Sequence, residues 1–195
     1  EQIAARLAAE RGATLVPAFD DPHIIAGQGT VGLELMQQAG EENLTPDQVL
    51  IGCSGGGLVS GSALAIRAMS PTTEVLCVEP EGFDDTRRSL AAGHRMANAP
   101  GARSICDALM SPSPGVLNFA LMRDLLAGGV AVSDAEVLNA MAWGFRHLRL
   151  VIEPGGAVAL AAVLAGKLPL RGRTTAIVIT GGNVDPATFV AALDR

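Results

Sequence analysis

The stretch from Leu50 to Gly61, LIGCSGGGLVSG, constrains the fold of this chain more than any other. Its first residues end a short apolar run that suits a buried strand, the glycines Gly55, Gly56 and Gly57 interrupt that run, and a helical pattern of apolar residues begins at Leu58. Amides of residues without a Cβ can converge on an anion, and the partial positive charge of a helix N-terminus strengthens the attraction. Two interpretations are open: a phosphate site built without Lys or Arg, or a tight turn that binds nothing.

Strand and helix patterns alternate along most of the chain. Strand patterns cover residues 49–52, 74–78, 130–132 and 175–179, and helical patterns cover 31–38, 58–69, 85–92, 117–126, 134–150, 157–166 and 186–193. Strands separated by helices pair in parallel through right-handed crossovers. The sequence therefore predicts an α/β fold with a parallel sheet, in which ligands bind at the carboxyl ends of the strands.

Local signals predict where several elements begin and end. Residues 1–11 have a helical pattern and residues 13–16 suit a short strand, although no partner strand precedes them. Thr30 or Gln28 is expected to cap the helix at 31–38, and Ser133 with a glutamate three residues later has the spacing of a capping box. Residues 97–114 are predicted to form a long irregular connection, and connections of this length usually serve a site or an interface.

Composition narrows the classes of function. The 195 residues suit one domain of ordinary size, and a hydrophobic share of 49% with 17% charged residues indicates a densely packed globular chain. A net charge of −6 without a basic run argues against nucleic acid or an anionic membrane as the main partner. The longest apolar region, Ala157–Gly166, is too short to cross a membrane, and the residues after Glu1 lack the features of a signal peptide. A cytoplasmic location is therefore expected.

Cysteine, lysine and histidine give no sign of a metal centre or a nucleophile. Cys53, Cys77 and Cys106 are odd in number and have no CxxC or His-linked spacing, so they are predicted to be buried free thiols in a reducing compartment. Lys167 is the only lysine and is expected to be solvated in its Gly-Lys-Leu-Pro turn. The histidines, which have no ligand or nucleophile partner in the sequence, are His23, His94 and His147.

Five separated motifs nevertheless occur together and in order. They are FDDPHIIAGQGT at 19–30, SGGGLVSG at 54–61, VEP followed by DD at 78–85, IEPGGAVALAA at 152–162 and TGGNVD at 180–185. Together they resemble the threonine dehydratase and serine racemase family of fold-type II pyridoxal-phosphate (PLP) enzymes, over almost the whole chain. The resemblance implies the fold of the tryptophan synthase β-like enzymes, a three-layer αβα large domain with a parallel sheet, here without its N-terminal part. Residues 1–18 would then be the tail end of the small domain and residues 19–195 the large PLP-binding domain.

The resemblance implies that the glycine loop grips the cofactor phosphate with backbone amides. The matching positions are Ser54, Gly55, Gly56 and Gly57, with Leu58 next. A serine stands where the family has its first glycine. Its hydroxyl is expected to donate one more hydrogen bond to the phosphate, although a side chain narrows the allowed backbone angles.

The resemblance also implies contacts to the cofactor ring. Thr180 matches the Ser/Thr that hydrogen-bonds to the pyridine nitrogen. A neutral hydroxyl cannot hold that nitrogen protonated, so the ring is a weaker electron sink, which favours elimination of a β-substituent. The alternative is a strand-end residue that caps the next turn. Phe19 matches the residue beside the ring, where serine racemases carry Asn, and so resembles a dehydratase. Glu153 matches a glutamate near the ring, or is simply a helix-break residue before a proline, and Ala108 stands where the family tends to have glycine.

A divalent-cation site is implied by the same resemblance. Glu79, Asp85 and the backbone carbonyl of Phe83 match a site of serine racemases and some dehydratases. Two carboxylates and a carbonyl are the hard oxygen ligands that Mg²⁺ or Ca²⁺ requires. Acidic residues at the start of a helix are also ordinary complements of the helix dipole, so both interpretations are open.

The activity implied for the intact enzyme is PLP-dependent β-elimination, the dehydration and deamination of a hydroxy amino acid such as L-threonine or L-serine to a 2-oxo acid and ammonia. The Schiff-base lysine and the substrate-carboxylate loop are expected upstream of residue 1, so no catalytic residue is expected in this chain, which should be inactive without the missing N-terminal half. A homo-oligomer, a homodimer above all, is also expected. The alternatives are a serine racemase, a hydroxyaspartate dehydratase, a hydroxyectoine-utilisation dehydratase and, outside the enzymes, a phosphate-ligand-binding fragment without catalysis.

Overall fold

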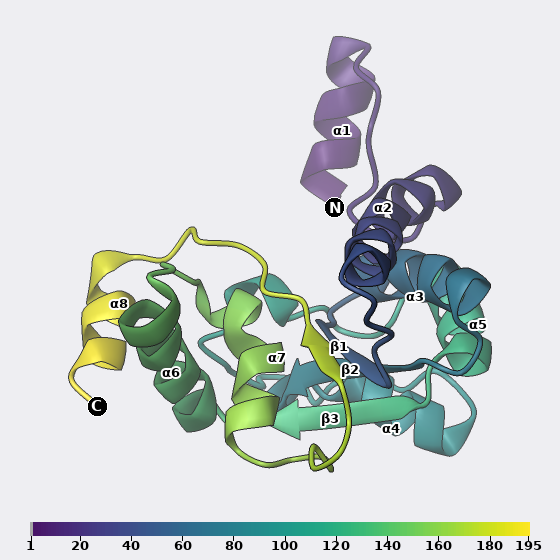
Figure 1. The fold of residues 1–195 in the computed structure, drawn as a ribbon. Coiled ribbons are helices and arrows are strands. Elements are labelled where there is room, and N and C mark those ends of the chain that lie inside the picture. The colour runs from purple at the N-terminus through teal and green to yellow at the C-terminus, as the bar shows by residue number, and fades with distance from the viewer. Residues whose placement is uncertain (1) are drawn as a thin grey trace.

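The structure, a computed structural model, describes residues 2–195 and contains one parallel sheet (Figure 1). The strands run in the order β3-β2-β1-β4, with β1 at Gln48–Gly52, β2 at Glu74–Pro80, β3 at Gly128–Val132 and β4 at Thr175–Ile177. β1 pairs in parallel with both β2 and β4, and β2 pairs in parallel with β3. The α/β fold with a parallel sheet is thereby confirmed.

Helices cover both faces of the sheet. One face carries α3 (Gly57–Met69), α4 (Asp85–Ala92) and α5 (Val116–Leu125), and the other carries α6 (Asp134–Trp143) and α7 (Pro154–Leu164); α2 (Pro22–Glu41) packs on α3, and α8 (Pro186–Leu193) packs on α6. Along β1, Val49 and Ile51 belong to the core beneath α3, whereas Leu50 belongs to the core beneath α7. Helices thus cover both faces of the sheet, which explains why the strand sequences are continuous apolar runs.

The start of α2 differs from the sequence prediction. The helix begins at Pro22, well before the predicted 31–38, because the carboxylate of Asp21 accepts the amides of His23 (2.8 Å) and Ile24 (3.3 Å) as an N-cap. Neither Thr30 nor Gln28 is the cap, so that prediction was wrong.

The glycines that suggested a loop before residue 31 serve helix packing instead. A Cβ on Gly32 would lie 2.8 Å from the Cα of Ser62 in α3, and a Cβ on Gly29 would lie 3.1 Å from the carbonyl oxygen of Gly61. The two helices approach so closely only because these positions lack side chains.

Other differences are small. Residues 13–16 have no regular secondary structure and form no strand within the described chain, since no neighbouring strand there pairs with them. The helix predicted over 134–150 is α6 followed by a π-helical turn, Gly144–Leu148, and it ends at Arg149 in the left-handed region. Ser133 and Glu136 form the predicted capping box.

The first helix stands apart from the sheet. α1 (Gln2–Arg11) projects away from the other layers in Figure 1, and the predicted helix at 1–11 is confirmed apart from Glu1, which lies outside the described residues. None of the helices in residues 2–195 has the length and apolar character needed to cross a lipid bilayer.

Candidate functional site

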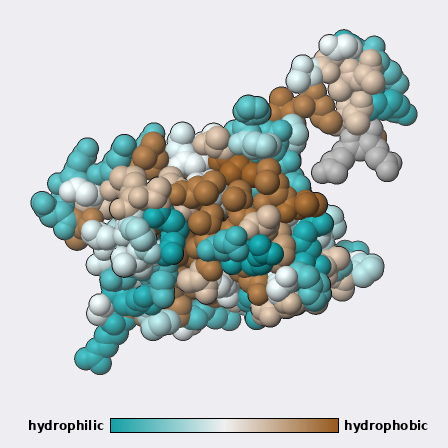
Figure 2. All heavy atoms as spheres, turned by 90° about the vertical axis from the view of Figure 1, so that its right-hand side faces the viewer, coloured by the Kyte–Doolittle hydropathy of each residue, from teal (hydrophilic) through white to brown (hydrophobic). Residues whose placement is uncertain are grey.

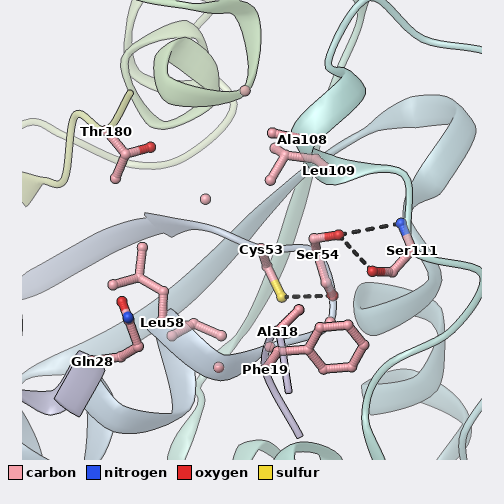
Figure 3. Close-up of a pocket in the computed structure, with 16 residues that line it drawn as sticks. Ala18, Phe19, Gln28, Cys53, Ser54, Leu58, Ala108, Leu109, Ser111 and Thr180 are labelled. Atoms are coloured by element: carbon pink, nitrogen blue, oxygen red, sulfur yellow. Dashed lines mark hydrogen bonds between the residues drawn. The ribbon is translucent and has the colours of Figure 1, made fainter. Parts of the chain in front are cut away.

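A cavity of about 360 Å³ opens where the carboxyl ends of β1 and β4 meet (Figure 3). From β1 the chain continues to β2 on one side, while β4 pairs on the other side, so the cavity lies at a switch point of the sheet. The lining residues come from six separate stretches of the chain: Ala18, Phe19, Gln28, Gly52, Cys53, Ser54, Gly55, Gly56, Gly57, Leu58, Val59, Ala108, Leu109, Ser111, Gly155 and Thr180. This volume suits a small molecule.

The glycine loop presents free backbone donors to this cavity. Gly56 has a φ of 100° at the N-cap position of α3, where no side chain caps the helix. Among residues 2–195, no backbone group accepts a hydrogen bond from the amides of Gly55, Gly56 or Gly57. The first amides of a helix have no partner within it, and here no basic side chain of the described residues lines the cavity. The loop can therefore receive an anion with amides alone, which fits a phosphate group.

Close packing behind the loop requires the three glycines. A Cβ on Gly55 would overlap the ring of Phe19, and a Cβ on Gly57 would lie 3.1 Å from the Cβ of the same residue. A Cβ on Gly56 would lie 2.7 Å from the Cε of Met122 in α5, and the positive φ adds strain of its own. Phe19 thus lies against the loop and forms one wall of the cavity.

Ser54 is tolerated at the first position of the loop, and its hydroxyl has a partner. Its backbone is not in the left-handed region, which among non-glycine residues of the described chain only Asn43 and Arg149 adopt, so the side chain causes no strain. The hydroxyl donates to the Oγ of Ser111 at 2.8 Å and accepts the amide of Ser111 at 3.2 Å. The sequence had suggested a bond to phosphate, whereas in the structure the proton of this hydroxyl is directed at Ser111.

Two residues that the sequence analysis did not single out hold Phe19 in place. The carboxylate of Asp20 accepts the first amides of α5, from Val116 (2.8 Å), Leu117 (3.0 Å) and Asn118 (3.2 Å). The side-chain amide of Asn118 donates to the carbonyl oxygens of Phe19 and Gly55, both at 3.1 Å. The only signal in the sequence was a helix at 117–126 that lacks a capping side chain of its own.

Replacing Asp20 by alanine is expected to lower the free energy of unfolding by about 1–2 kcal/mol, because the first amides of α5 lose the carboxylate that accepts their hydrogen bonds. Urea denaturation of the intact polypeptide measures this difference. Asp124→Ala is the matched control, because Asp124 pairs only with the exposed Arg123, and exposed ion pairs contribute little to the free energy of unfolding. Equal stability of the two variants would contradict the assigned role.

Thr180 and the start of α7 form the opposite side of the cavity. Figure 3 shows Thr180 across the cavity from Ser54 and Phe19, with its hydroxyl oxygen turned toward the cavity. A Cβ on Gly156 would overlap the carbonyl group of Thr180, so α7 and residues 180–183 are in close contact.

Glu153 lies behind this segment and does not line the cavity. Its carboxylate accepts the amide of Asn183 at 3.0 Å, and a Cβ on Gly181 would overlap it. In the structure this glutamate therefore stabilises the position of the residues that follow β4.

The acidic residues at the end of β2 lie outside the cavity. Glu79 is fully buried, and its two carboxylate oxygens accept the amides of Thr86 (2.9 Å) and Arg87 (2.8 Å). Burial raises the pKa of Glu79 to about 8, although these hydrogen bonds oppose the rise. Burial likewise raises the pKa of Asp85 to about 6, against a hydrogen bond from Asn98.

These residues fit a cation only in part. The Oδ2 atom of Asp85 is buried without a hydrogen-bond partner, which leaves one carboxylate oxygen available. Each oxygen of Glu79 already accepts one backbone amide. Within the described chain, no cluster of three or more His, Cys, Asp or Glu side chains could hold a metal ion, so any site here depends on the carbonyl of Phe83 and on water.

Of the remaining candidates, only Cys53 lines the cavity, and the structure gives none of them a metal-binding or nucleophilic partner among the described residues. Cys53, Cys77 and Cys106 are buried and free, as predicted, and burial raises the pKa of Cys106 to about 12. Lys167 does not line the cavity, and its ammonium lies 2.9 Å from the carboxylate of Glu136, an ion pair that the sequence analysis missed. None of the three histidines lines the cavity.

Comparison with known proteins agrees with this geometry. The model of the family described as "Pyridoxal-phosphate dependent enzyme" matches residues 1–181. The chain is 36% identical over 193 residues to an L-threo-3-hydroxyaspartate ammonia-lyase from Pseudomonas sp, covering 99% of this chain and 59% of that protein. Similar solved structures are a threonine deaminase from T.th. (TM-score 0.89, 43% identity, 95% of this chain and 62% of that one) and a maize serine racemase (TM-score 0.87, 35% identity, 99% and 58%).

The match includes both sides of the cavity, since residues 54–58 and Thr180 fall within the matched span. The chain corresponds to about three fifths of the length of these relatives. Free amides at a helix N-terminus, at the switch point of a parallel sheet, are what a phosphorylated cofactor requires. With the fold-type II architecture of its structural neighbours, this chain belongs to the family of pyridoxal-phosphate-dependent enzymes.

Proposed function

We propose that the intact polypeptide carrying this chain catalyses PLP-dependent β-elimination from a hydroxy amino acid such as L-threonine or L-serine, giving a 2-oxo acid and ammonia. The observation that carries this proposal is the free-amide loop of residues 54–58 facing Thr180 across one cavity. Relatives named ammonia-lyase and threonine deaminase support the elimination chemistry.

Five residues that line the cavity, and Glu153 next to it, have a role in this proposal. The amides of Gly55, Gly56 and Gly57 bind the cofactor phosphate, and the hydroxyl of Thr180 meets the ring nitrogen as a neutral partner. Phe19 packs beside the ring, and Glu153 positions the segment that carries Thr180. When bound, PLP supplies the electron sink for loss of the α-proton and the β-hydroxyl. The lysine that binds PLP covalently is assigned to the part of the polypeptide before this chain.

Product analysis tests this function. The intact polypeptide with PLP is expected to release ammonia and a 2-oxo acid from L-threonine, L-serine or L-threo-3-hydroxyaspartate. Thr180→Val keeps the shape of the side chain but removes its hydroxyl, and is expected to slow the reaction about 10- to 100-fold. Racemisation of serine faster than ammonia release would favour the serine racemase alternative. Binding of PLP without turnover of any of these substrates would leave only a ligand-binding role.

We further propose that the preceding part of the polypeptide packs beside β4 and contains the small domain, with residues 1–18 as its tail end and residues 19–195 as the large domain. β4 pairs on one side only among the described residues and is half-buried, and α1 stands apart in Figure 1. The greater length of the relatives supports this arrangement.

A homodimer is proposed on separate grounds. Figure 2, seen from the side of α2, α3 and α5, shows apolar side chains gathered on one face. Leu33 on α2 and Leu64 on α3 are 40% and 41% exposed, and exposed apolar areas of this kind often mark interfaces. Light scattering of the intact polypeptide measures its oligomeric state.

The three buried free thiols support a cytoplasmic location.

We propose that Mg²⁺ or Ca²⁺ binds at Asp85, with the carbonyl of Phe83 and Glu79 as further ligands. Each carboxylate oxygen of Glu79 accepts one backbone amide and keeps a second lone pair for the cation. The buried, unpartnered oxygen of Asp85 supports this site. A cation at ten times its dissociation constant is expected to stabilise the intact polypeptide by about 1.4 kcal/mol, measured as a rise in Tm. Asp85→Asn should abolish the rise, and Glu81→Gln, at a neighbouring exposed carboxylate, should not. An unchanged rise in Asp85→Asn would place the cation elsewhere.

A further inference from the structure

We infer that Ser54 is a positioning residue, whose hydroxyl links the phosphate-binding loop to a neighbouring segment that forms another wall of the cavity. This segment, residues 104–114, is the second half of the connection between α4 and α5 and contributes Ala108, Leu109 and Ser111 to the lining. The inference rests on the proposed binding of PLP, and it assigns the serine a role other than contact with phosphate.

The link consists of two hydrogen bonds between the same two residues (Figure 3). The Oγ of Ser54 donates to the Oγ of Ser111 at 2.8 Å, and the amide of Ser111 donates back to the Oγ of Ser54 at 3.2 Å. Ser111 is also held on its other side, since the side chain of Asn98 donates to the carbonyl oxygen of Ser111 at 2.9 Å and the amide of Asn98 donates to that of Pro112. The far end of the segment is held separately, since Ser104 and Ile105 donate to the carboxylate of Asp134.

Little else fixes this segment to the loop. Its only regular element is the short 3₁₀ helix Asp107–Leu109, and long connections of this kind depend on side-chain contacts for their position. The amide of Gly115, just beyond the segment, donates to the carbonyl oxygen of Gly55 at 2.9 Å. Ser54 thus contacts the segment itself through its side chain, whereas Gly55 contacts only the residue after the segment, through its backbone carbonyl.

The geometry separates this role from direct binding of phosphate. A hydroxyl has one proton, and the proton of Ser54 is used by Ser111, so Ser54 cannot donate to a phosphate while this link is intact. The donors that remain for phosphate are the backbone amides of the residues that follow. A glycine at this position would leave the amide of Ser111 without its acceptor.

A double-mutant cycle in the intact polypeptide tests the inference. Ser54→Ala is expected to raise the Kd of PLP about three- to tenfold, because one linked pair of hydrogen bonds is lost. Ser111→Ala should raise it by a similar or smaller factor, and the double variant should be no weaker than Ser54→Ala alone. Ser113→Ala is the matched control, since its hydroxyl lies in the same segment but accepts from Arg95 and should leave the Kd unchanged.

Two readouts do not depend on turnover. The ³¹P shift of bound PLP is expected to be the same in Ser54→Ala and in the unmodified protein, because the hydroxyl does not touch the phosphate. Amide hydrogen exchange of residues 104–114 is expected to be faster in Ser54→Ala, with or without PLP.

Several results would overturn the inference. The Kd of PLP could be unchanged in Ser54→Ala, or the double variant could raise the Kd by the product of the two single factors. The ³¹P chemical shift of bound PLP could differ between Ser54→Ala and the unmodified protein, or amide exchange of residues 104–114 could be the same in both. Failure of the proposed function looks different, because then the unmodified protein itself would not bind PLP, while the exchange difference between it and Ser54→Ala would persist.

Discussion

Replacing Gly55 by alanine is expected to weaken PLP binding by the intact polypeptide about 10- to 100-fold. The new Cβ would overlap the ring of Phe19, and overpacking of this kind costs about 1–3 kcal/mol. The ring cannot simply move aside, since the backbone beside it is held by Asp20 and Asn118. The Kd of PLP, measured by fluorescence titration, reports the loss.

Gly27→Ala is the matched control for this variant. Gly27 lies inside α2, and a Cβ there would meet no atom within 4 Å. Alanine is the better helix former by up to about 1 kcal/mol, so this variant should bind PLP normally and be as stable as the unmodified protein or more so. Comparable Kd values for the two alanine variants would show that the loop does not need its glycines.

Replacing Gly156 by alanine is expected to have the largest effect on stability, lowering the free energy of unfolding by about 3 kcal/mol or more. Its Cβ would overlap the carbonyl oxygen of Thr180 and lie 2.6 Å from the carbonyl carbon. Both neighbours are backbone atoms, so α7 or residues 180–183 must shift. Urea denaturation of the intact polypeptide measures the loss, and a shifted Thr180 should also weaken PLP binding.

The control for Gly156 is Gly40→Ala, near the C-terminal end of α2, where a Cβ would again meet no atom within 4 Å. Its stability should change by less than about 1 kcal/mol. If Gly156→Ala unfolded at the same urea concentration as Gly40→Ala, this result would contradict the close packing of α7 against Thr180.

Much of the fold could be predicted from local pattern. The alternation of apolar runs and helical periods indicated the parallel sheet, and the glycine loop after residues 49–52 indicated the start of α3. The start of α2 was missed for a physical reason. A glycine in a turn and a glycine at a helix contact look alike in sequence, and only the approach of Ser62 to Gly32 distinguishes them.

The site was predictable where it rests on motifs and not where it rests on long-range contacts. The glycine loop and Thr180 were expected to share a site, and they line the same cavity. The bonds from Asp20 to α5 and from Ser54 to Ser111 join residues far apart in sequence, which neither periodicity nor spacing can reveal. The strand expected at 13–16 fails for a related reason, since a strand needs a neighbour that the segment itself does not provide.

The measurement that tests the account most directly is the ratio of the Kd values of pyridoxal and PLP for the intact polypeptide. If the amides of residues 55–57 bind the phosphate, PLP should bind at least about a hundredfold more tightly than pyridoxal, because several hydrogen bonds to a charged group are lost without it. Gly55→Ala should reduce that ratio toward one. Equal affinities for the two compounds in the unmodified protein would contradict the claim that this loop is a phosphate site.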